Sequence, residues 1–411
     1  EMNERSPTSY ILHADGDSFF VACEVARRPE LRGLPVVVGE DRGIAAAMSY
    51  EAKRLGIHRG MPVYQIKKLY PECVILDHHF DYYREVSDGM YQILLSYVES
   101  VERYSIDECF AVVKHSDLVY FGGAENMLAQ IKKEIEIAHG VTYSFGLGRT
   151  KGLAKVASKL EKPNGLVVLA TQEDEDRALR ATSIDNIWGA GRKAIPRLQN
   201  LGLATAYELA HFDRARIARY FSEPMVALQR ELCGERVLAV EDDQDPREQK
   251  SIQSTGTFRP KSRDPKVIWA QLAENIEYAC KRARSLRLLG NKVSFFAKTA
   301  DFRYHTCEQT LAAYTADPGS IMNAIEQAFL RMLIPDEDIR ATGITLHGLI
   351  KEESAPVDLF GVHDRLAEQS CIEIVADGLR TKYGADIVRR ASSLPVAARG
   401  DADSFHPRAK I

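Results

Sequence analysis

Short apolar runs alternate with segments of helical spacing over residues 10–170 of the chain. Four of these runs predict buried strands, at residues 10–14, 98–101, 110–113 and 142–147. Apolar positions three and four apart predict helices at residues 81–98 and 126–138. The resulting order of one strand, a helix, two strands, a helix and a final strand is typical of the split βαβ sheet of a ferredoxin-like fold.

Further elements are predicted around this frame. Between the first strand and the first long helix, the pattern predicts helices at 19–26 and 49–56 and strands at 34–39 and 44–48. Ser18 has the position and residue type of an N-cap for the first of these helices. After the ferredoxin-like segment, a helix is expected at 151–159 and a strand at 166–169.

The second half of the chain is predicted to hold a helical module and then a mixed one. Helices are expected at residues 195–198, 204–210, 214–220 and 225–233. The acidic stretch 241–246, which ends in Pro246, is typical of a linker. Beyond it, the pattern predicts strands at 292–297 and 342–349, helices at 320–332 and 366–383, and a helix that contains residues 281–284.

The composition is that of a globular protein with more than one core. The chain has 411 residues, of which 45% are hydrophobic and 27% are charged, and such a length predicts about two to four domains. Its seven cysteines are widely spread and never in C-x-x-C spacing, which argues against a disulfide framework and a zinc site. No apolar run has the length of a membrane span and no signal-peptide pattern is present, so we expect a cytoplasmic protein.

The charge is unevenly distributed along the chain. The net charge is −4, which by itself does not indicate a nucleic-acid partner. Residues 250–303, however, hold twelve lysines and arginines and four acidic residues, so this segment carries +8 and the remainder carries −12. A basic segment in an acidic protein is typical of a surface that binds a polyanion.

Carboxylates are predicted to gather at the ends of two strands. Asp107 and Glu108 lie between the paired strands at 98–101 and 110–113, and Asp15 follows the first strand. If these strands are sheet neighbours, three carboxylates converge, with room for two cations. Carboxylate oxygens without His or Cys favour Mg²⁺ or Mn²⁺ over zinc. The alternatives are that Asp15 and Asp17 polarise a turn and that the acidic doublet is solvated surface.

Three residues near these carboxylates are suited to phosphate oxygens. Tyr50 and Lys53 are three apart on one helix and so share a face, and Lys162 lies in a turn. Solvated surface remains an alternative for both lysines. Further along, Gly189 and Gly191 form a small turn whose exposed backbone N–H groups are able to hold a DNA phosphate, as in a helix-hairpin-helix unit.

Five motifs carry a resemblance to a known family: HADGDSFF at 13–20, SYEAK at 49–53, SIDE at 105–108, KPNG at 162–165 and WGAG at 188–191. In order and spacing, across about residues 10 to 350, the chain resembles the Y-family, or translesion, DNA polymerases. The region around Tyr50 resembles the DNA polymerase IV branch of the family. The region 187–241 and the segment 357–360 resemble the catalytic subunit of DNA polymerase V.

This resemblance implies an α+β protein with the right-hand arrangement of a polymerase. The expected parts are a ferredoxin-like palm at 1–18 and 80–170, small fingers at 19–79, a helical thumb with a helix-hairpin-helix at 171–240, a linker at 241–249, an α+β little finger at 250–351 and a C-terminal extension at 352–411. We expect a monomer that binds primer–template DNA and dNTPs and no membrane.

The resemblance also implies roles for individual residues. Two Mg²⁺ ions, or Mn²⁺ in their place, would be held by Asp15, Asp107, Glu108 and the backbone carbonyl of Gly16. The nucleotide would contact Ser18, Phe19, Phe20, Tyr50, Lys53 and Lys162, with Phe20 as the steric gate that excludes ribonucleotides. DNA would contact Gly189, Gly191, Arg192, Arg259, Lys292 and Lys298.

A short apolar segment near the C-terminus is open to two interpretations. Residues 356–360 resemble a sliding-clamp-binding peptide that ends in Leu359 and Phe360, although its usual leading Gln is absent. The alternative is that Leu359 and Phe360 are a packing anchor in a loop. Accessory mutagenesis proteins are further candidate partners.

The expected activity is template-directed DNA synthesis past damaged bases, by two-metal-ion transfer of a nucleotide from a dNTP to a primer 3′-hydroxyl, in a DNA-damage (SOS) response. The rivals are a catalytically silent DNA-binding scaffold of a mutagenesis complex and a nucleotide cyclase with a similar palm. Three departures from the family pattern, Gly16, Ala47 and Lys53, predict weaker nucleotide binding, since lysine replaces the usual arginine and a hydroxyl is missing.

Overall fold

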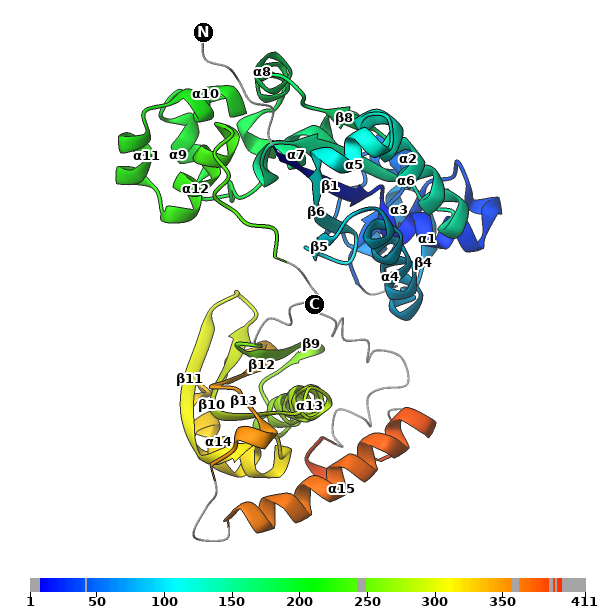
Figure 1. The fold of residues 1–411 in the computed structure, drawn as a ribbon. Helices are drawn as coiled ribbons and strands as arrows, with labels where there is room; N and C mark the ends of the chain where they lie inside the picture. The colour runs from blue at the N-terminus through cyan, green and yellow to red at the C-terminus, as the bar shows by residue number, and fades with distance from the viewer. Residues whose placement is uncertain are drawn as a thin grey trace. The chain divides into compact units, whose positions relative to one another are not determined.

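The computed structural model describes residues 8–40, 43–241, 249–356, 362–383, 387–388 and 390–393. The chain divides into two compact units, Glu1–Pro246 (unit 1) and Arg247–Lys410 (unit 2), each with its own sheets and helices (Figure 1). None of the helices in the described ranges is both long and apolar enough to cross a membrane.

The main sheet of unit 1 has the predicted split βαβ topology. Its strands follow the order β5-β6-β1-β7-β8; their bounds are β1 Ser9–Gly16, β5 Ser100–Arg103, β6 Glu108–Lys114, β7 Tyr143–Gly148 and β8 Leu166–Val168. Strand β1 lies between β6 and β7 and is antiparallel to both. The register places Asp15 opposite Glu108. The ferredoxin-like order is therefore confirmed, with β8 added in parallel at the edge.

Strand alternation divides the residues of β1 between two faces of this sheet. Leu12 and Ala14 pack into a core with α4 (Phe80–Tyr97) and α6 (Ala124–His139). On the opposite face, Ile11 packs with Phe110 and with Ala154 of α7 (Lys151–Leu160). Because side chains alternate along a strand, His13 and Asp15 lie on the face that α7 partly covers. The short helix α5 (His115–Tyr120) follows β6.

A small three-stranded sheet, in the order β3-β2-β4, is inserted after β1. The inserted elements are α1 Phe19–Arg27, the 3₁₀ turn η1 Pro29–Leu31, β2 Val36–Val38, β3 Ala47–Met48, α2 Tyr50–Arg54, α3 Val63–Leu69 and β4 Val74–Leu76. Ser18 occupies the N-cap position of α1, as expected, but its side chain makes no capping hydrogen bond. Its backbone is left-handed, at φ 50°, and its hydroxyl accepts a hydrogen bond from Lys53 Nζ at 3.0 Å.

The predicted helical module follows β8. Its elements are α8 Gln172–Ala181, the 3₁₀ turn η2 Ile184–Asn186, α9 Ile195–Gln199, α10 Ala206–His211, α11 Arg214–Tyr220 and α12 Glu223–Leu232. Their core includes Leu153 and Val156 from α7. Helix α7 therefore packs on the main sheet on one side and supports the helical module on the other.

Unit 2 is a second α+β module, with a four-stranded antiparallel sheet in the order β11-β10-β12-β9. Its elements are β9 Ile252–Ser262, α13 Pro265–Ser285, β10 Leu288–Thr299, β11 Tyr304–Thr315, α14 Pro318–Met332 and β12 Ile339–His347, with the short β13 Ile350–Lys351 beside β10 and the 3₁₀ turn η3 Glu352–Ser354 after it. The hydrophobic pattern did not predict β9 and β11. Strand β11 is at the sheet edge and only two of its twelve residues are buried, so its first seven residues form no apolar run.

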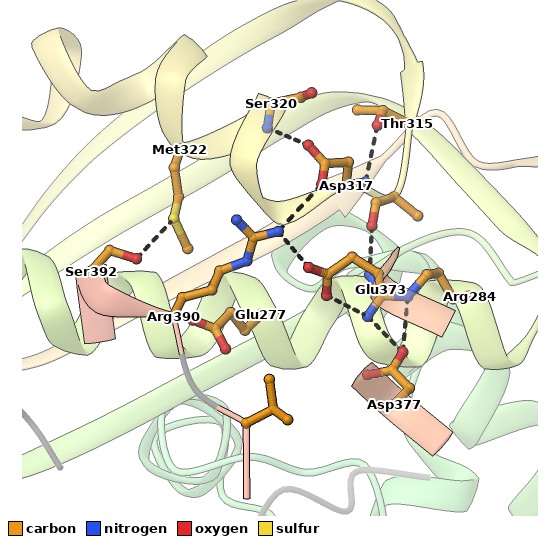
Figure 2. Close-up of polar contacts among 12 residues, drawn as sticks. Glu277, Arg284, Thr315, Asp317, Ser320, Met322, Glu373, Asp377, Arg390 and Ser392 are labelled. Atoms are coloured by element: carbon orange, nitrogen blue, oxygen red, sulfur yellow. Dashed lines mark hydrogen bonds and ion pairs between the residues drawn. The ribbon is translucent and has the colours of Figure 1, made fainter. Parts of the chain in front are cut away.

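Helix α15 (Val362–Tyr383) and the 3₁₀ turn η4 (Ala391–Ser393) pack against the helices of unit 2 through charged side chains (Figure 2). Arg284 of α13 contacts Asp377 at 2.6 Å and Glu373 at 3.4 Å. Arg390 contacts the same Glu373 at 2.5 Å and Asp317 at 3.5 Å. The Arg284 side chain is only 8% exposed. Each buried charge is therefore compensated by at least one opposite charge.

We expect Arg284→Ala to lower the free energy of unfolding of unit 2 by about 2 kcal/mol, because Glu373 and Asp377 would each lose one of the arginines that compensate their buried charges. Calorimetry of the full chain measures the effect on the transition of this unit. The matched control is Arg263→Ala, since Arg263 is paired with Asp338 at the surface and its loss should change little. Equal effects of the two substitutions would contradict a stabilising role of the α15 contact.

Candidate active site

Three carboxylates converge at one end of β1. The sheet register places Asp15 directly opposite Glu108. The backbone N–H of Gly16 donates to the Asp107 carbonyl at 2.8 Å, which holds the bend before β6 against the end of β1. The Ser105 hydroxyl donates to Asp107 Oδ1 at 2.5 Å. The predicted strand pairing therefore brings Asp15, Asp107 and Glu108 to the same end of the sheet, where β1 ends and β6 begins.

Two lysines compensate these carboxylates. Lys155 Nζ of α7 contacts Glu108 Oε2 at 2.7 Å, and Lys162 Nζ contacts Asp15 Oδ1. Lys155 also lies over the rings of Tyr104 and Trp188, with its Nζ 4.5 and 5.2 Å from their centroids. Lys155 was not among the site residues predicted from the sequence. The spacing of lysines 151, 155 and 159 along one predicted helix face was a signal that could have identified it.

The acidic cluster fits a cation. Burial raises the pKa of Asp107, and the nearby charge of Asp15 raises it further, while the Ser105 hydroxyl acts in the opposite direction. Burial also raises the pKa of Glu108, against the effect of Lys155. Buried carboxylates that lie close together are costly to ionise, and a divalent cation would compensate their charges. Oxygen donors of this kind suit Mg²⁺ or Mn²⁺.

His13 is a further neighbour of the cluster that sequence reasoning did not select. One of its ring nitrogens, an Asp15 oxygen and a Glu108 oxygen all lie within 4.8 Å of one another. Nδ1 contacts the Ser158 hydroxyl at 2.7 Å, and that hydroxyl donates to the Lys155 carbonyl at 3.1 Å. Burial is the main cause of a strongly lowered His13 pKa. Side chains two residues apart on a strand lie on the same face, so the sequence pattern of β1 could have identified His13 as a neighbour of Asp15.

Asp17 differs from Asp15 although it is only two residues away. Its carboxylate accepts hydrogen bonds from the Ser144 hydroxyl at 2.7 Å, the Thr142 hydroxyl at 3.1 Å and the Asn164 backbone N–H at 2.7 Å. These bonds join the end of β1 to β7 and to the turn that contains Lys162. The turn interpretation left open for Asp15 and Asp17 therefore describes Asp17, and Asp15 faces the carboxylate cluster.

Tyr50, Lys53 and Lys162 lie on the side of the carboxylates nearest α2. Burial is the largest of the causes that raise the pKa of Tyr50, followed by the charges of Asp17 and Asp15 and a hydrogen bond to Asp17. Lys53 Nζ is 4.1 Å from the centroid of the Tyr50 ring. Burial and the neighbouring charge of Lys162 lower the pKa of Lys53. The structure thus places these three side chains together, with the ammonium groups of Lys53 and Lys162 beside the carboxylates.

The two adjacent phenylalanines have different surroundings. Phe19 is buried in the core, with only 2% of its surface exposed, and its ring occupies the space beside Gly16. A Cβ on Gly16 would lie 3.0 Å from Phe19 Cδ2, so a larger residue at position 16 would require Phe19 to move. Phe20 is half-buried and stacks on Tyr83. Ala47, in β3, packs at the margin of a small apolar cluster.

The predicted DNA-contacting residues of unit 1 lie in the turn between η2 and α9. Gly189, at φ +84°, and Gly191 and Arg192 are exposed. Trp188, at the start of the turn, donates from Nε1 to the Tyr104 hydroxyl at 3.0 Å. Because Tyr104 precedes the acidic doublet and also contacts Lys155, this turn is fastened to the strand bend that bears Asp107.

In unit 2, Lys292 and Lys298 lie on the same face of β10, opposite its core face. Lys292 contacts Glu308 Oε2 at 2.5 Å, and Lys298 lies over the exposed rings of Phe302 and Tyr304, at 4.9 and 4.6 Å. Arg340 lies over Phe302 as well, at 4.4 Å. Exposed rings beside cationic side chains are suited to nucleic acid. Phe302, Tyr304 and Arg340 were not among the DNA-contacting residues predicted from the sequence.

Three sequence-based expectations about unit 2 have different outcomes. Arg284, which was counted in the basic segment, is buried in ion pairs with α15 and does not contribute to an exposed basic face. Arg259 lies in β9, and the structure does not describe its side chain. Leu359 and Phe360 lie outside the described residues.

Comparisons with known proteins match almost the whole chain. Residues 14–159 match the impB/mucB/samB family, and residues 249–359 match the C-terminal domain of that family. The chain is 30% identical over 395 residues to a DNA polymerase IV of Desulfatibacillum aliphaticivorans, covering 95% of this chain and 98% of that protein. It is 32% identical over 344 residues to a DNA polymerase IV of Methanoculleus marisnigri, covering 82% and 93% of the two chains.

Solved structures show the same fold at lower identity. A chimera of Y-family DNA polymerases matches at 22% identity with a TM-score of 0.69, covering 83% of this chain and 99% of the chimera. The crystal structure of DinB from Sulfolobus solfataricus matches at 23% identity with a TM-score of 0.53, with the same coverage of both chains.

We expect Asp17→Asn to lower the free energy of unfolding of unit 1 by about 1–3 kcal/mol, because an amide cannot accept all the hydrogen bonds that Asp17 receives. Thermal unfolding measures the change. Asp81→Asn is the control, since Asp81 is fully exposed. If both variants unfold at the wild-type temperature, Asp17 does not hold the end of β1 to its turn.

Proposed function

This chain belongs to the Y-family of DNA polymerases and carries out lesion-bypass DNA synthesis, and we propose that Asp15, Asp107 and Glu108 are its catalytic carboxylates. The observation that supports this assignment most directly is the register of β1 against β6, which sets Asp15 opposite Glu108, with Asp107 in the adjoining bend held to Gly16. The 30% identity to a DNA polymerase IV, over a region that covers 95% of the chain, also supports it.

Two divalent cations, Mg²⁺ or Mn²⁺, would be held by these three carboxylates and the Gly16 carbonyl, where they would activate the primer 3′-hydroxyl and neutralise the triphosphate. The chain's own groups would prepare this arrangement. Ser105 orients Asp107 through a 2.5 Å hydrogen bond. Lys155 and Lys162 balance the charges of Glu108 and Asp15. Lys162 would exchange its carboxylate partner for a phosphate oxygen when the nucleotide binds.

The incoming nucleotide would lie between the carboxylates and α2. Tyr50 and Lys53 share one helix face beside Asp15 and Asp17. The Tyr50 hydroxyl and the ammonium groups of Lys53 and Lys162 would therefore surround the triphosphate. Ser18 would contribute its hydroxyl, which already contacts Lys53. Phe19 would support the backbone at Gly16, and Phe20, the half-exposed ring of the pair, would face the sugar as the steric gate.

The polymerase parts would correspond to the elements of the two units. Residues 1–18 and 80–170 would form the palm, 19–79 the fingers and 171–240 the thumb. The segment 241–249 would be the linker to a little finger at 250–351. Primer–template DNA would contact the Gly189–Arg192 turn in unit 1 and, in unit 2, Lys292, Lys298 and Arg259, to which we add Phe302, Tyr304 and Arg340.

Other partners and the location are proposed from the sequence. The segment 352–411 would be an extension in which Leu359 and Phe360 bind a sliding clamp, and accessory mutagenesis proteins would act with the enzyme in a DNA-damage response. We expect a monomer that works in the cytoplasm. The thiols of Cys23, Cys109 and Cys280 are buried and free, as suits a reducing compartment.

A catalytically silent scaffold remains the alternative function. It would keep the fold and the DNA-binding surfaces but would not need a cation site. Three neighbouring carboxylates favour the enzyme, since burial is the main cause that raises the pKa values of Asp107 and Glu108, and a scaffold has no need of buried carboxylates that are costly to ionise.

Asp107→Ala should reduce Mg²⁺-dependent primer extension by about 10²–10³-fold, since losing a metal-binding carboxylate removes several kcal/mol of transition-state stabilisation. Primer extension on damaged and undamaged templates is the measurement, accompanied by Mn²⁺ binding followed by electron paramagnetic resonance. Glu125→Ala, at an exposed acidic residue of α6, is the control. A wild-type protein that extends no primer, or an Asp107→Ala variant as active as wild type, would favour the scaffold.

Lys53→Arg should lower the KM for dNTPs several-fold with little change in kcat, because a guanidinium holds phosphate oxygens through two parallel hydrogen bonds. Steady-state primer extension provides both constants. The control is Lys68→Arg, which makes the same exchange at an exposed position of α3. An unchanged KM would show that Lys53 does not contact the triphosphate.

A further inference from the structure

The half-exposed Phe20 ring packs against two other aromatic rings, those of Tyr83 and Phe80. Phe20 and Tyr83 stack with their centroids 4.7 Å apart and their planes 16° apart. Phe80 meets Phe20 edge-on, at 5.6 Å and 90°, and it meets Tyr83 at 5.8 Å and 78°. Tyr83 is fully buried. The position and tilt of the Phe20 ring therefore depend on where Tyr83 lies.

Tyr83 is itself held by a buried carboxylate. Its hydroxyl donates to Glu24 Oε1 at 2.8 Å, and Glu24 has no exposed surface. His79 Nδ1 contacts the same oxygen at 2.7 Å. Arg28 Nη2 donates to the other oxygen at 2.5 Å. Both oxygens of Glu24 are thus occupied, which restricts its rotation.

The contacts among Phe20, Glu24 and Tyr83 form a closed cycle that joins two helices. Phe20 and Glu24 are four residues apart on α1, so they lie on the same helix face. Tyr83 comes from α4 and contacts both of them. Burial would raise the pKa of Glu24, but the hydrogen bonds from Tyr83, Arg28 and His79 outweigh it and lower the pKa. Glu24 therefore remains a charged acceptor, and such hydrogen bonds are stronger than neutral ones.

We propose that Glu24 is a positioning residue for sugar discrimination, which it controls by fixing Tyr83 and, through Tyr83, the plane of the Phe20 ring. This inference rests on the proposed gate role of Phe20. A gate excludes a 2′-hydroxyl by steric repulsion, which falls steeply with distance. A ring that can tilt backward would accommodate the extra oxygen, whereas a ring stacked on an anchored tyrosine cannot.

The simpler reading is that Glu24 only joins α1 to α4. A purely structural bond would change the use of deoxyribonucleotides and ribonucleotides by the same factor. A positioning role would change their ratio. The ratio of kcat/KM for a dNTP to kcat/KM for the matching ribonucleotide is therefore the quantity that separates the two readings.

Tyr83→Phe tests the relay, because it removes the hydroxyl and keeps the stacked ring. We expect the ratio to fall about tenfold, on the scale of a lost hydrogen bond to a charged group, with a smaller effect on dNTP incorporation alone. Glu24→Gln, which keeps the side-chain shape and one good acceptor, should give a smaller fall. The matched control is Tyr97→Phe, which removes a 2.7 Å hydrogen bond from a tyrosine of the same helix to Glu134.

Phe20→Ala separates this inference from the proposed function on which it rests. A Phe20→Ala variant with an unchanged ratio would overturn the gate itself. If Phe20→Ala lowers the ratio while Tyr83→Phe and Glu24→Gln behave like Tyr97→Phe, the gate stands and the role of Glu24 is overturned. A fall in the ratio for Phe20→Ala, Tyr83→Phe and Glu24→Gln, with none for Tyr97→Phe, supports the inference.

Discussion

The antiparallel register of β1 and β6 is the constraint on which the site depends. It places Asp15 opposite Glu108 on the sheet face that α7 partly covers. A slip of one residue would turn Asp15 toward the apolar core between the sheet and its two long helices. The hydrogen bond from Gly16 to the Asp107 carbonyl continues this pairing beyond the strand. The backbone, and not the side chains, therefore brings the carboxylates together.

Helix α7 supplies the compensation that such a cluster needs. Lys155 faces Glu108 and is enclosed by the rings of Tyr104 and Trp188. The same helix contributes Leu153 and Val156 to the core of the helical module. A single element thus covers part of the sheet face that holds the carboxylates, balances their charge and supports the module whose exposed turn is proposed to hold DNA. Displacement of the helical module would move α7 and so change the contact between Lys155 and Glu108.

Neighbouring residues of the same type have different roles in this site. Asp15 faces the other carboxylates, whereas Asp17 accepts hydrogen bonds that close a turn. Phe19 fills the space beside Gly16, whereas Phe20 presents a half-exposed ring stacked on Tyr83. In each pair the residue type is the same, and only the direction of the side chain from its strand or helix differs.

The sequence by itself determined the order of the elements that form the ferredoxin-like sheet and its two long helices, and it determined the candidate carboxylates. Helices with a regular apolar stripe, such as the one at 81–98, and strands with apolar runs were predictable because their pattern repeats over neighbouring residues. The edge strand β11 was not predictable, because only two of its twelve residues are buried and its first seven residues form no apolar run. Only the tertiary structure decided that Lys155 opposes Glu108, that Arg284 is buried by α15 and that Glu24 anchors Tyr83. These contacts join residues far apart in the chain, and local periodicity carries no information about which charge meets which.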